Sequence, residues 1–151
     1  MVHFVLAGHR PRYTELILAG EKTVELRKRR PLVPPGSMVV MYASHPTCAI
    51  VGAFVLERIV SLQPAKLWRA HGSQTGVSQE VFNRYYENSD QAFGLVVGEV
   101  MPLEHQVTLD ALRRLWSGFH PPQSYRYLHR GRTRSVNLRF SDRTEYFTLQ
   151  A

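Results

Sequence analysis

The chain has 151 residues, of which 44% are hydrophobic and 21% are charged, a balance typical of one soluble globular domain. No apolar run reaches the roughly 20 residues of a membrane-spanning helix, and the single cysteine, Cys48, excludes an internal disulfide. The N-terminus lacks the pattern of a secretory signal, so we expect a cytoplasmic protein without a membrane partner. The net charge of +7 rests mainly on arginine, because only three of the 19 basic residues are lysines. Arginine pairs with phosphate through two hydrogen bonds and stacks on bases, so nucleic acid is the expected partner.

Hydrophobic patterning and turn residues predict short strands interrupted by short helices. The expected strands cover residues 2–7, 22–27, 38–43, 49–62 and 92–104. The expected helices cover residues 12–19, 64–71, 78–86 and 108–116. From residue 118 onward we expect a turn-rich basic segment with short strands at 135–140 and 145–149. These elements indicate a single α+β domain over residues 1–151, built on a partly closed β-barrel, with a basic C-terminal extension at about 129–151.

The segment GEKTVELR, residues 20–27, carries the clearest chemical signal. Gly20 ends the first predicted helix, and strand alternation then places Glu25 and Arg27 on one face, with Lys22 at the strand entry. A lysine, a carboxylate and an arginine held this close suit a planar, hydrogen-bonding, partly anionic ligand. Lys22 and Glu25 are the candidate acid and base if the protein is an enzyme. The structural alternative is an ion pair in which Glu25 orients Arg27.

Several segments resemble the ASCH (activator signal cointegrator homology) domain family. The family pattern of glycine, lysine, glutamate and arginine is met by Gly20, Lys22, Glu25 and Arg27. Residues 39–46 resemble the next family strand, residues 82–86 a middle helix, and PPQSYRYL at 121–128 a late loop of the prokaryotic members. The resemblance covers roughly residues 1–128.

The resemblance implies a PUA-like barrel with a cleft between the signature strand, the first helix and the late loop. It also implies action on RNA or modified nucleosides. Some family members resemble ribonucleases, and a short subgroup resembles amidohydrolases of N4-acetylcytidine. Those amidohydrolases carry threonine at the position of Glu25 and keep lysine at the position of Lys22.

We therefore predict an RNA-binding cleft that takes a single-stranded or modified nucleotide. Tyr42 would stack on a base, whose edge would meet Glu25, Ser44 and Gln123. The structural alternatives are a half-buried Tyr42 that closes the barrel and a plain surface turn around Gln123. The predicted nucleic-acid-binding residues are Lys22, Glu25, Arg27, Tyr42, Ser44, Gln123, Ser124 and Arg126. Secondary phosphate contacts are expected from Arg10, Arg29, Arg30, Arg130, Arg132 and Arg134.

The seven histidines show no zinc-binding spacing, and we expect neither a metal nor another cofactor. His9 or His45 is placed to lie near the cleft as a proton shuttle. The alternative function is that of a metal-independent ribonuclease or an amidohydrolase of a modified nucleoside. A protein-interaction module without a nucleic acid partner is a third class. Neither the oligomeric state nor the choice between RNA and DNA follows from the sequence.

Overall fold

The computed structural model describes residues 3–149. Its strands are β1 (Phe4–His9), β2 (Val24–Arg27), β3 (Met38–Ala43), β4 (Ala49–Leu62), β5 (Ala92–Thr108), β6 (Tyr125–Arg130), β7 (Val136–Arg139) and β8 (Thr144–Leu149). Its helices are α1 (Pro11–Leu18), α2 (Pro64–His71), α3 (Gln79–Tyr85) and α4 (Leu109–Leu115), with a 3₁₀ turn at Gly72–Gln74. The strands form one eight-stranded sheet in the order β2-β5-β4-β3-β1-β6-β8-β7. The predicted α+β class is confirmed.

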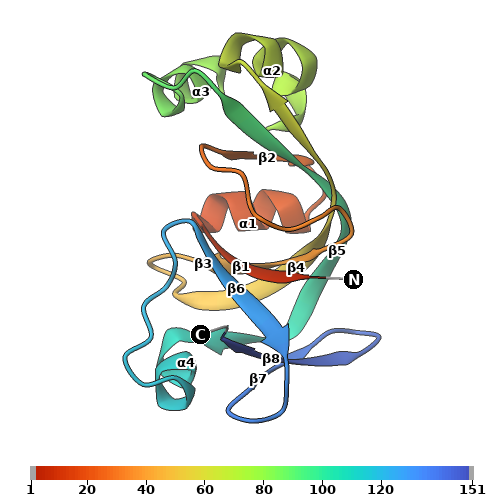
Figure 1. Ribbon diagram of the computed structural model, residues 1–151, viewed down its shortest axis with the longest axis vertical. Helices are drawn as coiled ribbons and strands as arrows, with labels where there is room; N and C mark the ends of the chain where they lie inside the picture. Colours follow the sequence, from red (N-terminus) through yellow and green to blue (C-terminus); the bar gives the residue numbers. More distant parts are fainter. Residues whose placement is uncertain (1–2, 150–151) are drawn as a thin grey trace.

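The sheet is coiled rather than flat because its two longest strands are irregular. The antiparallel pairing of β4 with β5 shifts register at three places, and such bulges bend a strand and increase its twist. β1 runs parallel to β3 and antiparallel to β6, so it lies at the centre of the sheet. Figure 1 shows α2 and α3 at one end of the molecule, α4 with β7 and β8 at the other, and α1 and β2 between them.

The short strand β2 separates an apolar region from a polar one. Val24 and Leu26 pack with Leu67 and Phe82 beneath α2 and α3. The alternate residues Glu25 and Arg27 are also buried, and they line a cavity on the side of β1 and α1 that Leu26 borders as well. The alternation predicted for this segment therefore divides hydrophobic packing from a cluster of charges.

Two local predictions need correction. Residues 125–130 were expected to lie in a loop, but they form β6, which pairs with β1. The signal was the spacing of Tyr125 and Tyr127, which both pack against the core cluster around Val5 and Ile17. The first strand also extends to His9, two residues beyond its predicted end at residue 7. Its predicted start, residue 2, lies outside the described residues.

Gly8 in β1 provides a test of how closely the segment at 121–124 packs on this strand. A Cβ atom at Gly8 would lie 2.3 Å from the carbonyl oxygen of Pro122. We therefore expect Gly8→Ala to lower the free energy of unfolding by about 1–3 kcal/mol, the usual cost of overpacking. Gly131→Ala is the matched control, because its Cβ would meet Thr148 Cγ2 at an ordinary 3.4 Å. Urea denaturation of both variants measures the difference, and equal stabilities would contradict the close packing.

Candidate functional site

A cavity of about 450 Å³ opens between the end of β1, α1, β2 and α3. Four buried polar side chains form its floor: His9, Lys22, Glu25 and Arg27. Apolar and aromatic residues form its wall: Tyr13, Leu26, Val77, Val81, Phe82 and Tyr85. Exposed polar residues form its rim: Arg10, Arg84 and Gln123. The volume falls within the range of small-molecule sites, roughly 300–1,000 Å³.

The turn after α1 places Lys22 on the floor of the cavity. Gly20 has φ of +78°, a conformation that L side chains rarely adopt, and the amides of Gly20 and Glu21 donate to carbonyls of the last helical turn. The backbone amide of Lys22 donates to Leu16 at 3.1 Å. The chain can therefore leave the helix and place Lys22 at the entry of β2 within two residues, as the sequence pattern predicted.

Lys22 is 1% exposed, although its side chain ends in a charged group. Its Nζ donates a hydrogen bond to the carbonyl oxygen of Thr75 and lies 3.9 Å from Glu25 Oε1. It also lies 4.9 Å from the ring centroid of Tyr13. Burial lowers the pKa of Lys22, and the nearby Arg27 adds to this effect, whereas Glu25 opposes it.

Glu25 is the only carboxylate on the floor. Its Oε1 accepts a hydrogen bond from the Leu26 amide at 3.0 Å. Its Oε2 lies 2.5 Å from His9 Nε2 and 3.9 Å from Arg27 Nη2, but neither contact has hydrogen-bond geometry. Burial alone would raise the pKa of Glu25, but attraction to His9, Arg27 and Lys22 outweighs it and lowers the pKa to about 2. The carboxylate is therefore ionised at neutral pH.

Arg27 and His9 connect the carboxylate to β1. Arg27 Nη2 donates to the Gly8 carbonyl oxygen at 2.8 Å and lies 3.2 Å from His9 Nε2, while Arg27 Nε is buried without a partner. His9 Nδ1 lies 3.1 Å from the Ala7 carbonyl oxygen, to which it donates. Burial lowers the pKa of His9, and the Glu25 carboxylate opposes this shift. Because Nδ1 already carries a proton, a second proton on Nε2, which faces Glu25, would make His9 a cation.

The floor holds more positive than negative charge. With Lys22 as an ammonium and Arg27 as a guanidinium, two cations face one carboxylate even when His9 is neutral. Buried charges are costly unless partners compensate them. The remaining positive charge therefore favours a ligand that brings negative charge or hydrogen-bond acceptors into the cavity.

The structure brings together only some of the predicted site residues. Lys22, Glu25 and Arg27 meet on the floor, and Gln123 lies on the rim. Tyr42 lies outside the cavity, in the core cluster that also contains Leu112 and Trp116, and its burial raises its pKa to about 12. Tyr42 is 2% exposed, so it is more deeply buried than the half-buried tyrosine of the structural alternative, and it does not line the cavity.

Ser44, Ser124 and Arg126 also lie outside the cavity lining. The Ser44 amide donates to the His9 carbonyl oxygen at 2.8 Å. The Ser124 carbonyl oxygen accepts from the Gly8 amide at 3.4 Å. Arg126 lies in β6, not in a loop, with its guanidinium 5.9 Å from the Phe119 ring centroid. These residues support the strands around the cavity.

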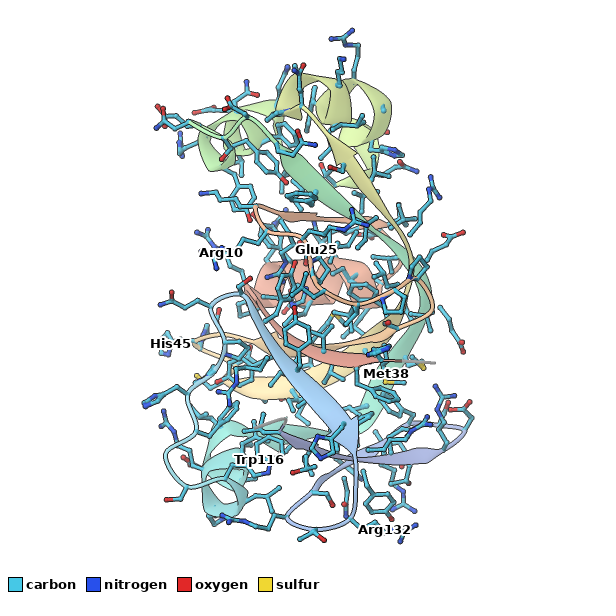
Figure 2. All side chains as sticks on the ribbon, viewed as in Figure 1. Arg10, Glu25, Met38, His45, Trp116 and Arg132 are labelled. Carbon is cyan, nitrogen blue, oxygen red and sulfur yellow. The ribbon has the colours of Figure 1, made fainter. Side chains whose placement is uncertain are left out.

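The arginines expected to make secondary phosphate contacts fall into separate groups. Arg10 lies on the rim, and Arg29 and Arg30 are exposed directly after β2. The remaining three lie around β6 and the turn before β7: Arg130, Arg132 and Arg134. Figure 2 shows Arg10 near Glu25, whereas Arg132 lies at the far end of the molecule. Arg130 is paired with Glu145 at 3.0 Å, and the guanidinium of Arg132 lies 4.4 Å from the Tyr146 ring centroid.

Sequence reasoning missed the aromatic wall. Tyr13, in α1, is half-buried and lines the cavity, but the sequence analysis did not assign it to the site. Phe82 and Tyr85 were noted only as part of a helix that resembles one in the ASCH family. Of the two histidines considered, His9 reaches the cavity, while His45 is exposed and does not line it (Figure 2). Helical spacing from Phe82 to Tyr85 was an available signal for a shared face.

The sequence and the fold are both similar to those of known proteins. Residues 8–104 match the ASCH domain model. The chain belongs to the ASCH domain family. An ASCH domain-containing ribonuclease from Zymomonas mobilis is 29% identical over 126 residues, which span 83% of this chain and 84% of that protein. The crystal structure of ASCH from Zymomonas mobilis has a TM-score of 0.79 at 28% identity, covering 83% of this chain and 87% of that one.

A shorter similarity links the chain to large ribosomal subunit protein uL22 from Ureaplasma parvum. The two are 34% identical over 58 residues, which are 38% of this chain and 19% of that protein. Within residues 3–149, no helix is long and apolar enough to cross a membrane. In the same range, no three His, Cys, Asp or Glu side chains are grouped so that they could hold a metal ion.

The lowered pKa of Glu25 predicts how the free energy of unfolding changes at low pH. In the unfolded chain this carboxyl takes up a proton near its ordinary pKa of 4.5, whereas in the folded protein it does so only near 2. The ionised Glu25 carboxylate therefore stabilises the fold fully above about pH 4.5. As the pH falls toward 2, the free energy of unfolding decreases by about 3 kcal/mol. Urea denaturation between pH 5 and pH 2.5 should show this loss.

Glu25→Gln isolates the contribution of this carboxylate, because the glutamine amide does not titrate. The variant should lose stability less steeply than wild type over the same pH range. Glu57→Gln, at an exposed position on β4, is the matched control and should keep the wild-type slope. Parallel curves for wild type and Glu25→Gln would show that the buried carboxylate does not carry the effect.

Proposed function

We propose that this protein binds single-stranded RNA and takes one unpaired nucleotide into the cavity. The observation that carries this proposal is the buried floor, on which Lys22 and Arg27 face a single carboxylate at 3.9 Å each. Such a floor attracts an electron-rich ligand, and a base carries carbonyl oxygens while its backbone carries phosphate. A bound nucleotide would supply negative charge beside Arg27, whose buried Nε has no hydrogen-bond partner.

The wall and the rim support the same ligand class. Tyr13, Phe82 and Tyr85 offer aromatic surface for a base, and stacking of this kind is worth roughly 1–3 kcal/mol per base. Arg10 and Arg84 stand at the rim, where they would meet the flanking phosphates. The net charge of +7 adds long-range attraction to RNA. The similarity to a protein named as a ribonuclease points to the same polymer.

Further phosphate contacts complete the proposed path of the strand. The exposed pair Arg29 and Arg30 lies two and three residues after Arg27 at the end of β2. Arg132 and Arg134, near β7, would require a longer strand, because Figure 2 places Arg132 at the other end of the molecule. We place the protein in the cytoplasm, where single-stranded RNA is available.

Substitution of Lys22 tests whether RNA enters this cavity. Lys22→Met keeps the length of the side chain but removes the ammonium, so a charge-assisted contact worth about 1.5–3 kcal/mol should be lost. The dissociation constant for a fluorescent single-stranded RNA decamer should rise about 10- to 100-fold, measured by anisotropy at fixed salt. Lys66→Met removes the same charge from the exposed face of α2 and should change affinity far less. Equal effects of the two substitutions would place RNA elsewhere on the protein.

Cleavage of the bound RNA without a metal is the second candidate function. The favouring observation is that Lys22, whose pKa is lowered by burial, lies 3.9 Å from an ionised carboxylate. In such a reaction the 2′-hydroxyl oxygen attacks the adjacent phosphorus, and the bond from phosphorus to the 5′-oxygen breaks. Glu25 would accept the 2′-hydroxyl proton, Lys22 would protonate the leaving oxygen, and Arg27 would stabilise the charge on phosphorus.

An assay in EDTA decides between binding and cleavage. End-labelled single-stranded RNA is incubated with wild type, Lys22→Met and Glu25→Gln, all purified in the same way, and read on a denaturing gel. If the protein is a metal-independent ribonuclease, only wild type will cut, and a single 2′-deoxy substitution will block the cut at that position. Intact RNA in every lane would reject metal-independent cleavage and favour a binding protein or an enzyme of free nucleosides.

A further inference from the structure

We infer that the cavity floor selects uracil among the four RNA bases, by offering a donor, an acceptor and a second donor to one edge of the base. This inference rests on the proposed function, because it assumes that a nucleotide enters the cavity. Its basis is the order of charges around Glu25. Lys22 Nζ lies beside Oε1 and Arg27 Nη2 lies beside Oε2, each at 3.9 Å. The two cations therefore flank opposite oxygens of the same carboxylate.

Each member of this array has hydrogen-bonding capacity left. The Lys22 ammonium has three protons and gives one to the Thr75 carbonyl oxygen. Arg27 has five N–H groups, and its Nε has no partner although it is buried. The Glu25 carboxylate accepts one hydrogen bond, from the Leu26 amide to Oε1, and so has lone pairs left. All three side chains line the cavity, so a base that enters it lies beside the carboxylate and its two cations.

Backbone contacts fix the two cations in place. Lys22 is tied to the carbonyl oxygen of Thr75, and Arg27 is tied to that of Gly8 at 2.8 Å. The side chains are nearly fully buried, so neither cation can turn outward to solvent when an unsuitable base arrives. A base that does not match the array therefore leaves buried polar groups without partners, which weakens its binding.

Uracil matches the array at all three positions. Its O4 and O2 atoms accept from the cations, and the N3–H group between them donates to the carboxylate. Guanine matches with O6 and N1–H, but its 2-amino group faces the second cation. Cytosine matches only with O2, because its 4-amino group faces a cation and its N3 lone pair faces the carboxylate. Adenine matches at no position, because its 6-amino group faces a cationic donor and its N1 lone pair faces the carboxylate.

The aromatic wall of the cavity does not discriminate among the four bases. Stacking on Tyr13 or Tyr85 is open to every base, because each base has an aromatic face. Base preference must therefore come from the floor, and the same floor should accept other rings with two carbonyl groups flanking an N–H. This separation between wall and floor gives the inference a specific chemical test.

The test compares RNA decamers made of uridine, of cytidine, and of N3-methyluridine, in which a methyl group replaces the donor at N3. Anisotropy at fixed salt should show the uridine decamer binding at least about tenfold more tightly than either of the others, as expected for one lost contact to a charged group. Equal affinity for uridine and N3-methyluridine would overturn the inference. So would equal affinity for uridine and cytidine. If affinity for all decamers depends on Lys22 but not on the base, the proposed function stands and this inference fails.

Variants locate the preference on the floor. Glu25→Gln offers both a donor and an acceptor to the base, so the ratio of uridine to cytidine affinity should fall toward one. Arg84→Gln, on the rim, should weaken both decamers alike and leave the ratio unchanged. Circular dichroism checks that Glu25→Gln is folded, and the comparison with N3-methyluridine on wild type remains decisive if it is not. An unchanged ratio in a folded Glu25→Gln variant would contradict the role of the carboxylate.

Discussion

The buried carboxylate of Glu25 is the contact on which the arrangement of the site depends. It lies between groups from β1, from the turn after α1 and from β2 itself, with His9 Nε2 at 2.5 Å and both Lys22 Nζ and Arg27 Nη2 at 3.9 Å. Without this anion, three basic side chains would be buried together with nothing to offset their repulsion. The carboxylate thus allows a cationic surface to exist inside a folded domain, and it does so without neutralising that surface completely.

The sheet supplies the frame that makes this cluster possible. Register shifts along β4 and β5 coil the long strands, so β2 at the sheet edge comes to face α1 and the end of β1. The alternation in β2 then serves two purposes, since Val24 and Leu26 join the core under α2 and α3 while Glu25 and Arg27 form the cavity floor. Leu26 is also part of the cavity wall. Core packing and the charged cavity floor are therefore supplied by alternate residues of the same short strand.

The elements with strong local signals were predictable from the sequence. Residues 38–43, 49–62 and 64–71 match β3, β4 and α2 in both bounds, because β-branched runs and a helix beginning with proline are determined locally. β6 was missed because two prolines and several polar residues suggested a loop, whereas its pairing with the distant β1 made it a strand. Tyr42 was assigned to the cleft from its place in a strand, but strand position does not reveal which face meets the core. The charged floor was recognised because its lysine, glutamate and arginine are close in sequence, while the aromatic wall depends on tertiary packing.

The compactness of the motif also limits how this family can change by insertion or deletion. Three of the four floor residues fall within six consecutive positions, from Lys22 to Arg27. Because strand side chains alternate with a period of two, adding or removing one residue before Glu25 would exchange the two faces of β2. Apolar side chains would then replace the charged ones on the cavity floor, and two charged side chains would enter the apolar core at once. Point substitutions can change the cavity lining one residue at a time, but a change of length at this point would remove the charged floor and part of the core together.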